Sequence, residues 1–315
     1  MDPICHTLAG ATLAESGLKR WSAWGTTTLI LAANAPDIDV FAYATGSVFA
    51  LGARRGWTHG LLALLLLPLI LAAIIWSVDR LRNREPALRA RFRGLFLLAA
   101  VGVLSHPLLD FMNVYGIRLL MPFADEWFYG DTLFIVDPWM WAILTAGIAF
   151  TMRKRRNGSA DPERAAGLAL VVASIYVVGM GVGRWTARSM VEESVVDTRD
   201  ARLMVAPARV DPLRKFWVAD DGETYRLGEV RLIPPAVTVY DRVVPKRLAE
   251  AGAAANTQRG ATFLDWARFP FVEIEQRRDS TIVYIIDARY TLDRDASFGA
   301  VRVALPNAPA SAGAS

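Results

Sequence analysis

Apolar runs of membrane length, separated by clusters of arginine, are the feature that most restricts how this chain can fold. The long runs cover residues 60–78, 94–109, 133–152 and 165–185. A helix of about 20 apolar residues crosses the hydrocarbon core of a bilayer. Backbone inside that core must satisfy its own hydrogen bonds, which a helix does. The sequence therefore predicts a multi-span α-helical membrane domain.

Two shorter apolar runs, residues 4–18 and 26–35, precede the long ones. Each is shorter than the ~20 residues that a spanning helix needs. We expect a pair of short helices that either re-enter the bilayer or span it where it is thin, and the pattern leaves both arrangements open.

The positive charges orient the predicted spans. Arginines crowd residues 79–93, and Arg153-Lys154-Arg155-Arg156 follows the third long run. Loops rich in lysine and arginine face the cytoplasm, so we expect everything after Trp185 to lie on the outer side. These clusters supply much of the net charge of +4. The charge is therefore topological, and no nucleic-acid partner is expected.

The character of the chain changes from about Ser189. Segments 225–227, 231–239, 271–276 and 281–286 are enriched in β-branched and aromatic residues, as strands are. Asp279-Ser280 indicates a hairpin turn between the last two, and residues 248–267 favour a helix. The predicted fold class is mainly α: a helical membrane domain (1–188), then a small α+β soluble domain (189–305) and a disordered tail (306–315).

The three histidines, His6, His59 and His106, all lie at the edges of apolar runs. His106 and Asp110 are four residues apart, so on a helix they share one face and can grip one ion. The alternative is a buried histidine whose tautomer is fixed by a hydrogen bond to the carboxylate. Because ionisable groups in membrane segments are costly and mark function, the spacing favours a ligand pair.

Asp37 and Asp39 follow the second short run, within a stretch that also has the composition of a turn. If the backbone there is extended, both carboxylates can reach one ion or bridge two. Arg54 to Gly60 has the composition of an interfacial loop with Trp57 as a belt aromatic. In the functional interpretation His59 is a ligand, and Arg54 or Arg55 contacts a phosphate.

One topology brings all these candidates to the outer end of the bundle. Nitrogen and oxygen donors of this kind suit zinc first, with manganese or iron as alternatives. We predict one or two divalent ions, bound by His6, Asp37, Asp39, His59, His106 and Asp110. Glu126, in the acidic stretch before the third long run, is a candidate for a general base or a solvated loop residue. The single cysteine, Cys5, excludes an intrachain disulfide.

Four blocks of residues resemble a known family, the YdjM inner-membrane proteins. The blocks are Asp2-Pro3 with His6, Thr7 and Gly10; Ala35-Pro36-Asp37-Ile38-Asp39; Arg55-Gly56-Trp57-Thr58-His59; and His106 with Asp110, Tyr115 and Gly116. The resemblance covers residues 1–185 and implies a metal-dependent hydrolase of the bacterial inner membrane. Two departures are Arg54, where members often have histidine, and Gly60, where they often have serine.

The order of the ligands is also similar, more distantly, to the zinc-dependent phospholipase C and P1-nuclease group. That similarity implies that Asp37, His59, His106 and Asp110 hold one ion. His6 would hold a second ion, with Asp110 bridging the two. The later histidines of that group have no counterpart in this chain, which argues against a three-metal site.

The resulting hypothesis is a multi-pass hydrolase of the bacterial inner membrane with an extracytoplasmic C-terminal domain. It would cleave a phosphoester of a lipid or lipid-linked substrate by metal-activated water, with Arg55 as the catalytic residue that steadies the anion. A second hypothesis is a membrane scaffold or sensor with a structural metal site and a partner-binding outer domain. A third, a metal or proton transporter, would require ligands near the bilayer midplane.

Overall fold

The computed structural model describes residues 1–315 except 83–84, 196–201, 242 and 307–315. The described chain divides into two compact units. The first consists of Met1–Phe41, Ala53–Thr186 and Ala206–Lys215; the second consists of Ala42–Gly52, Ala187–Val205 and Phe216–Ser315. The expected disordered tail lies, beyond Pro306, outside the described residues.

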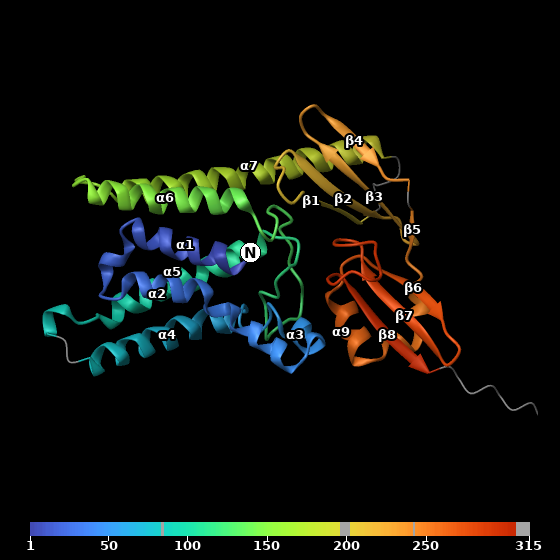
Figure 1. Cartoon of the computed structure of the whole chain (residues 1–315), viewed down its shortest axis with the longest axis horizontal. Coiled ribbons are helices and arrows are strands. Elements are labelled where there is room, and N and C mark those ends of the chain that lie inside the picture. Colours follow the sequence, from blue (N-terminus) through green and yellow to red (C-terminus); the bar gives the residue numbers. More distant parts are fainter. Residues whose placement is uncertain (83–84, 196–201, 242, 307–315) are drawn as a thin grey trace, which may run out of the picture. The chain divides into compact units, whose positions relative to one another are not determined.

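The first unit is helical, and its helices run side by side in Figure 1. They are α1 (Pro3–Glu15), α2 (Gly25–Asn34), α4 (Leu61–Leu81), α5 (Phe92–Phe111), α6 (Pro138–Arg156) and α7 (Arg164–Ser194). Short 3₁₀ segments join them: η1 (Leu18–Trp21), η2 (Ala35–Thr45) and η3 (Pro86–Leu88). Helix α3 (Ser47–Ala53) follows η2 and belongs mostly to the second unit.

Aspartate–proline pairs define the starts of two of these helices. The Asp2 side chain accepts hydrogen bonds from the Ile4 and Cys5 backbone N–H groups, and the Asp137 side chain caps α6 in the same way. A proline follows each aspartate at the first helical position, where a missing N–H costs nothing. Both helix starts are therefore fixed locally by the sequence.

Small residues allow the helices that carry the candidate ligands to pack closely. A Cβ atom on Gly102 of α5 would lie 2.5 Å from Ala32 Cβ of α2, and one on Gly10 of α1 would lie 2.7 Å from the Leu29 carbonyl oxygen. Neither position can accept a side chain without moving the backbone opposite. Helix α2 is thus held tightly between α1 and α5.

Three helices are long and apolar enough to cross a membrane: α4, α5 and α7. They confirm the first, second and fourth long runs as candidate spans. The third run, 133–152, differs from expectation, because Asp137 and Pro138 delay the start of α6 and Arg153–Arg156 occupy its last turn. Helix α6 is therefore not apolar over a full span, although it packs along α7, with Gly147 against Ala169.

The second unit contains two sheets. The first has strands β1 (Arg202–Pro207), β2 (Arg214–Asp220), β3 (Thr224–Arg231) and β4 (Ala236–Val239) in that order, with β5 (Val244–Pro245) pairing with β3. The second is antiparallel, with the order β6 (Pro270–Gln276), β7 (Ser280–Asp287) and β8 (Ala300–Pro306). An α+β domain after the helical region is thereby confirmed.

Two details of this unit correct the expectations. The single strand expected over 231–239 is a hairpin, because Pro234 and Pro235 lie in the turn between β3 and β4 and cannot donate to a ladder. The single helix expected over 248–267 is three pieces: η4 (Leu248–Ala251), α8 (Gly252–Ala255) and α9 (Gln258–Trp266). Thr257, which caps α9 through the Gly260 N–H, is extended and interrupts the helix. The hairpin turn at Asp279-Ser280 is confirmed, with the Arg277 N–H donating to the Ser280 carbonyl.

Candidate metal centre

Four segments of the first unit bring the candidate ligands together. His6 lies on α1, Asp37 and Asp39 on η2, His59 just before α4, and His106 and Asp110 near the C-terminal end of α5. Figure 1 shows the chain's first residues beside that end of α5. His106 and Asp110 are fully buried, whereas Leu104, two residues before His106, and Leu108, between the two ligands in the sequence, are exposed. The i, i+4 pair therefore faces the helix bundle, as expected from its spacing.

Four of the six predicted ligands form one cluster. Asp37, His59, His106 and Asp110 each offer a ligand atom, and these atoms all lie within 4.8 Å of one another. His59 Nε2 lies 3.1 Å from His106 Nε2, and Asp110 Oδ2 lies 3.3 Å and 3.4 Å from these two nitrogens. This is the same foursome that the similarity to the phospholipase C group implied for one ion.

The proton on His106 is fixed by its second nitrogen. His106 Nδ1 lies 2.7 Å from the Ala33 carbonyl oxygen. A carbonyl can only accept, so Nδ1 carries a hydrogen, and Nε2 is the nitrogen whose lone pair is available to bind an ion. A backbone carbonyl that holds the non-ligating nitrogen is a common second-shell partner of metal-binding histidines.

His59 is oriented in a similar way, by Thr58 and Asp39. The Thr58 hydroxyl lies 2.9 Å from His59 Nδ1 and donates to Asp39 Oδ2 at 3.2 Å, so its oxygen can accept the Nδ1–H hydrogen bond. Asp39 Oδ2 lies 3.4 Å from His59 Nδ1 and accepts from the Arg55 N–H at 2.8 Å. Burial lowers the pKa of His59, which keeps the ring neutral. Asp39 is outside the group of four, and its position behind His59 is that of a carboxylate that orients a ligand.

The cluster has the chemistry of a cation site. Two imidazole nitrogens and two carboxylate oxygens converge, and Asp110 Oδ2 has no hydrogen-bond partner among the described residues. Buried lone pairs facing one another without a proton between them are unfavourable unless a cation joins them. Two nitrogen and two oxygen donors match the ligands that zinc takes. The residues present therefore fit a divalent metal.

Asp37 forms the open edge of the cluster. Its Oδ1 atom is 3.9 Å from His106 Nε2, farther than Asp110 Oδ2 is from either histidine, and its side chain is 12% exposed. Arg54 donates to the same Asp37 oxygen at 3.1 Å. Three ligands are thus buried and fixed, while the fourth is shared with an arginine at the surface.

The other oxygen of Asp110 faces a second group of charges. Arg55 Nη2 lies 3.0 Å from Asp110 Oδ1, and the Met1 amine also contacts this oxygen. The Arg55 guanidinium donates to the Asn113 side chain at 2.8 Å and lies 4.6 Å from the centre of the Tyr115 ring. Arg55, the predicted catalytic residue, is buried and is hydrogen-bonded to Asn113, Asp110 and the Gly116 carbonyl. These contacts suit a role in positioning Asp110.

His6 is close to the cluster but lies on the Arg55 side of Asp110. Its ring stacks on His106 with centroids 3.7 Å apart, and His6 Nε2 is 3.3 Å from Asp110 Oδ1. Asp110 therefore bridges two sets of groups, as the second-ion hypothesis requires. The Arg55 guanidinium already places a positive charge against the same oxygen, and so competes with a second cation there.

Several supporting roles at the centre were not predicted from the sequence. Asn113 and Thr58 hold Arg55 and Asp39, and the Ala33 carbonyl orients His106. The role of a backbone carbonyl cannot be predicted from a sequence. Asn113 could have been considered, because it is a polar residue three positions after Asp110, where the chain leaves the helix. Glu126 is exposed, and it is not part of the cluster of four.

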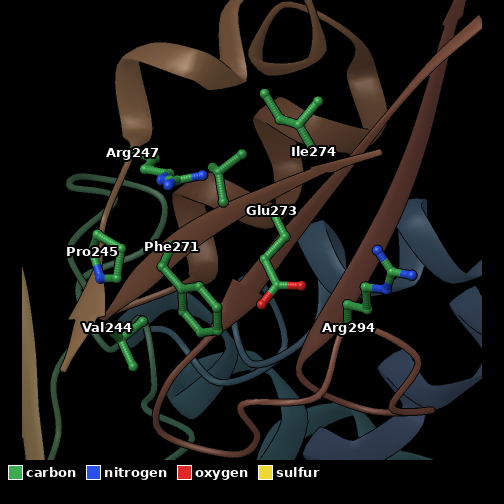
Figure 2. A pocket seen from close by; sticks show the side chains of 8 residues that line it. Val244, Pro245, Arg247, Phe271, Glu273, Ile274 and Arg294 are labelled. Atoms are coloured by element: carbon green, nitrogen blue, oxygen red, sulfur yellow. The ribbon is translucent and has the colours of Figure 1, made fainter. Parts of the chain in front are cut away.

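The second unit carries a separate pocket, shown in Figure 2. It has a volume of about 340 Å³ and lies between β5 and β6. Arg247 and Arg294 lie on either side of Glu273, whose carboxylate points to the same side of β6 as the Phe271 ring. Apolar side chains and the charged groups of Arg247, Glu273 and Arg294 line the pocket together, and such charged groups can bind a small polar ligand.

Comparison with known proteins agrees with the helical region described above. The chain is 23% identical over 296 residues to the uncharacterized protein YfhP of Bacillus subtilis (strain 168), covering 92% of this chain and 79% of that protein. No solved structure matches the chain. The family described as YdjM inner membrane protein matches residues 1–186, which include the whole ligand cluster. The chain therefore belongs to the YdjM inner membrane protein family.

Proposed function

We propose that this protein is a membrane-embedded, metal-dependent hydrolase that cleaves a phosphoester. The observation that carries the proposal is the convergence of Asp37, His59, His106 and Asp110, with the histidine protons directed away from the centre. A divalent cation bound there, zinc first among the candidates, would polarise a phosphoryl oxygen and make bound water acidic.

The protein groups around the centre have distinct tasks in this proposal. The Thr58 hydroxyl, held by Asp39, keeps the Nε2 lone pair of His59 directed inward, and the Ala33 carbonyl does the same for His106. Arg55 and Asn113 hold Asp110 in one orientation from behind. These positions are buried, so the ligands stay in place without substrate, as a preorganised site requires.

Arg54 is the group that we assign to the anionic substrate. Its side chain is 18% exposed and lies at the open edge of the cluster, on Asp37. A guanidinium pairs with phosphate as well as with carboxylate, so an incoming phosphoryl group can take over part of the pairing that Asp37 has now. Arg55 would not contact the substrate in this proposal. It would act by holding Asp110 in position.

The open edge also supports catalysis over a purely structural metal. Structural zinc sites have four fixed protein ligands, whereas catalytic sites have three and keep one position for water or substrate. Three of the four ligands here are buried, and the fourth is shared with Arg54. We place the site at the outer end of the bundle in the bacterial inner membrane, with the C-terminal unit extracytoplasmic, because the arginine-rich loops lie at the other ends of the spans.

The test is hydrolysis of bis(p-nitrophenyl) phosphate and p-nitrophenyl phosphate by detergent-purified protein. Activity should need added zinc or manganese and disappear in His106→Ala. Zinc-loaded protein that turns over neither ester would contradict the proposal.

A scaffold or sensor with a structural metal is the second candidate, and the charged pocket between β5 and β6 favours it. In that case removing the metal with a chelator would lower the melting temperature, yet no substrate would be turned over. An Arg294→Ala variant would then lose partner binding while it keeps its metal.

A further inference from the structure

The depth of the metal centre within the apolar spans bears on the kind of molecule that can reach it. His106 lies five residues before the end of α5, or about 7.5 Å along the helix axis at 1.5 Å per residue. His59 lies two residues before α4 begins. Half of the hydrocarbon core is about 15 Å thick. The centre therefore lies in the outer half of one leaflet, within about 7.5 Å of the level where lipid head groups meet acyl chains.

Large apolar side chains are exposed on the segments that surround the centre. We name Ile38, Phe41, Trp57 and Phe123 the apolar collar. Ile38 and Phe41 follow Asp37 on η2, and Trp57 is two residues before His59. Phe41, Trp57 and Phe123 are 77%, 62% and 78% exposed. Aromatic residues at such a level are typical of the boundary between lipid and water.

The loop that carries Phe123 is joined to the segment that carries Trp57 and His59. The Arg118 N–H donates to the Arg55 carbonyl, and the Leu61 N–H donates to the Leu119 carbonyl. A Cβ atom on Gly60 would lie 2.2 Å from the Met121 carbonyl oxygen, so the two stretches are in direct contact. The collar is thus continuous with the lipid-facing surface of α4, where Leu61, Leu62 and Leu65 are exposed.

We infer that the substrate is a phosphorylated membrane lipid, whose head group reaches the Asp37–Arg54 edge while its acyl chains stay among the collar residues. This inference rests on the proposed function, because it assigns the substrate class of the same centre. A phosphate suits Arg54 and a divalent cation, and hydrocarbon suits the collar and the depth. A phospholipid carries both groups in one molecule.

The experiment compares substrates that share a head group and differ in their tails. Zinc-loaded protein in nanodiscs or detergent is given dioleoyl and water-soluble dibutyryl forms of phosphatidylglycerol and of phosphatidate. Both ester types are included because the head group is not specified. We expect kcat/KM to be at least about tenfold higher for the dioleoyl form, since each buried methylene adds favourable transfer energy.

A collar variant makes the comparison specific. In Phe41→Ser/Trp57→Ser/Phe123→Ser, the ratio of dioleoyl to dibutyryl turnover should fall about tenfold, because less apolar surface is left to hold the tails. Leu88→Ser is the matched control, since Leu88 is as exposed as Trp57 but lies on η3, between the other ends of α4 and α5. Its ratio should stay at the parent value. The milder Trp57→Phe should keep most of the preference and guards against misfolding of the triple variant.

The outcomes separate the inference from the proposed function. Equal turnover of the two tail lengths, or a ratio that the collar variant leaves unchanged, would overturn the inference while hydrolysis itself stands. If neither these lipids nor bis(p-nitrophenyl) phosphate were cleaved, both would fall. As a readout without activity, a bimane label on Trp57→Cys should be quenched by lipids brominated near the head group, and absence of quenching would also overturn the inference.

Discussion

Replacing Asp39 with asparagine separates a carboxylate that binds the ion from one that only orients His59. Asp39 Oδ2 accepts from the Arg55 N–H and the Thr58 hydroxyl and lies 3.4 Å from His59 Nδ1. An asparagine oxygen can still accept from the Arg55 N–H. The substitution removes the negative charge that holds the Thr58 hydroxyl, which is the acceptor of His59 Nδ1–H, so the hydrogen-bond chain that keeps Nε2 free is weakened.

The size of the effect follows from that weakened chain. His59 is fully buried, and a hydrogen bond to a charged group, such as that from Thr58 to Asp39, contributes about 1.5–3 kcal/mol. Second-shell carboxylates on metal-binding histidines are worth roughly 10–100-fold in metal affinity. As a free energy of binding, that loss of affinity is about 1.4–2.7 kcal/mol. It agrees with the free energy given above for the hydrogen bond. We therefore expect Asp39→Asn to bind one zinc ion with an affinity lowered by one to two decades.

The assay is a zinc titration of detergent-purified full-length protein in competition with a chromophoric chelator, together with elemental analysis of the metal content. His106→Ala should lose stoichiometric metal, and Asp125→Asn, an exposed carboxylate paired with Arg118 at 3.0 Å, should keep the parent affinity. If Asp39→Asn lost its metal as completely as His106→Ala, Asp39 would be a ligand and the orientation argument would be refuted. An unchanged zinc affinity in Asp39→Asn would also refute the orientation argument, because Asp39 would then have no influence on His59 as a ligand.

Three further predictions concern the surrounding structure. Gly102→Val should lower both the melting temperature and zinc affinity, because its side chain would push Ala32 and the adjacent Ala33 carbonyl away from His106; overpacking of this kind costs about 1–3 kcal/mol. Cys5 is fully buried, so a maleimide should label it only after unfolding. Burial lowers the pKa of Lys215 to about 8 from an ordinary value of 10.5. Between these values the unfolded chain binds more protons, so stability should rise with pH over that window, and Lys215→Met should remove the rise in melting curves.

The spacing of His106 and Asp110 predicted their convergence because an apolar run fixed the helix on which they lie. The fate of Asp37 and Asp39 could not be predicted in this way. An extended backbone would direct residues two apart to the same side, as the sequence interpretation required. The segment is instead a 3₁₀ helix, in which residues two apart differ by about 240°. Asp37 consequently faces the cluster and Asp39 faces the back of His59.

The position of Arg55 and the strands β1 and β2 could not be predicted either, because no local sequence pattern encodes them. Arg55 meets Asp110 across 55 residues of chain, a contact that no local pattern encodes. Most residues of β1 are buried regardless of alternation, and β2 contains the buried Lys215, so neither strand shows the polar–apolar period that reveals a half-exposed strand. The long apolar runs could be predicted as helices in spite of such effects, because their length alone restricts the structures that they can form.

The balance of charge at the centre yields a final prediction about the bond that is cleaved. Three carboxylates, Asp37, Asp39 and Asp110, lie with the two guanidiniums of Arg54 and Arg55, and the Met1 amine also contacts Asp110. The cationic groups nearly balance the carboxylates, so a divalent ion would make the whole positive. A positive centre in a poorly solvated setting favours an anionic substrate over a neutral one. Bis(p-nitrophenyl) phosphate should therefore be hydrolysed in preference to p-nitrophenyl butyrate, measured as the ratio of kcat/KM. Arg54→Gln should reduce that ratio about tenfold, the change expected when one charge-assisted pairing of about 1.5 kcal/mol is lost. A neutral ester cleaved as well as the phosphate by the parent protein would show that charge does not select the substrate.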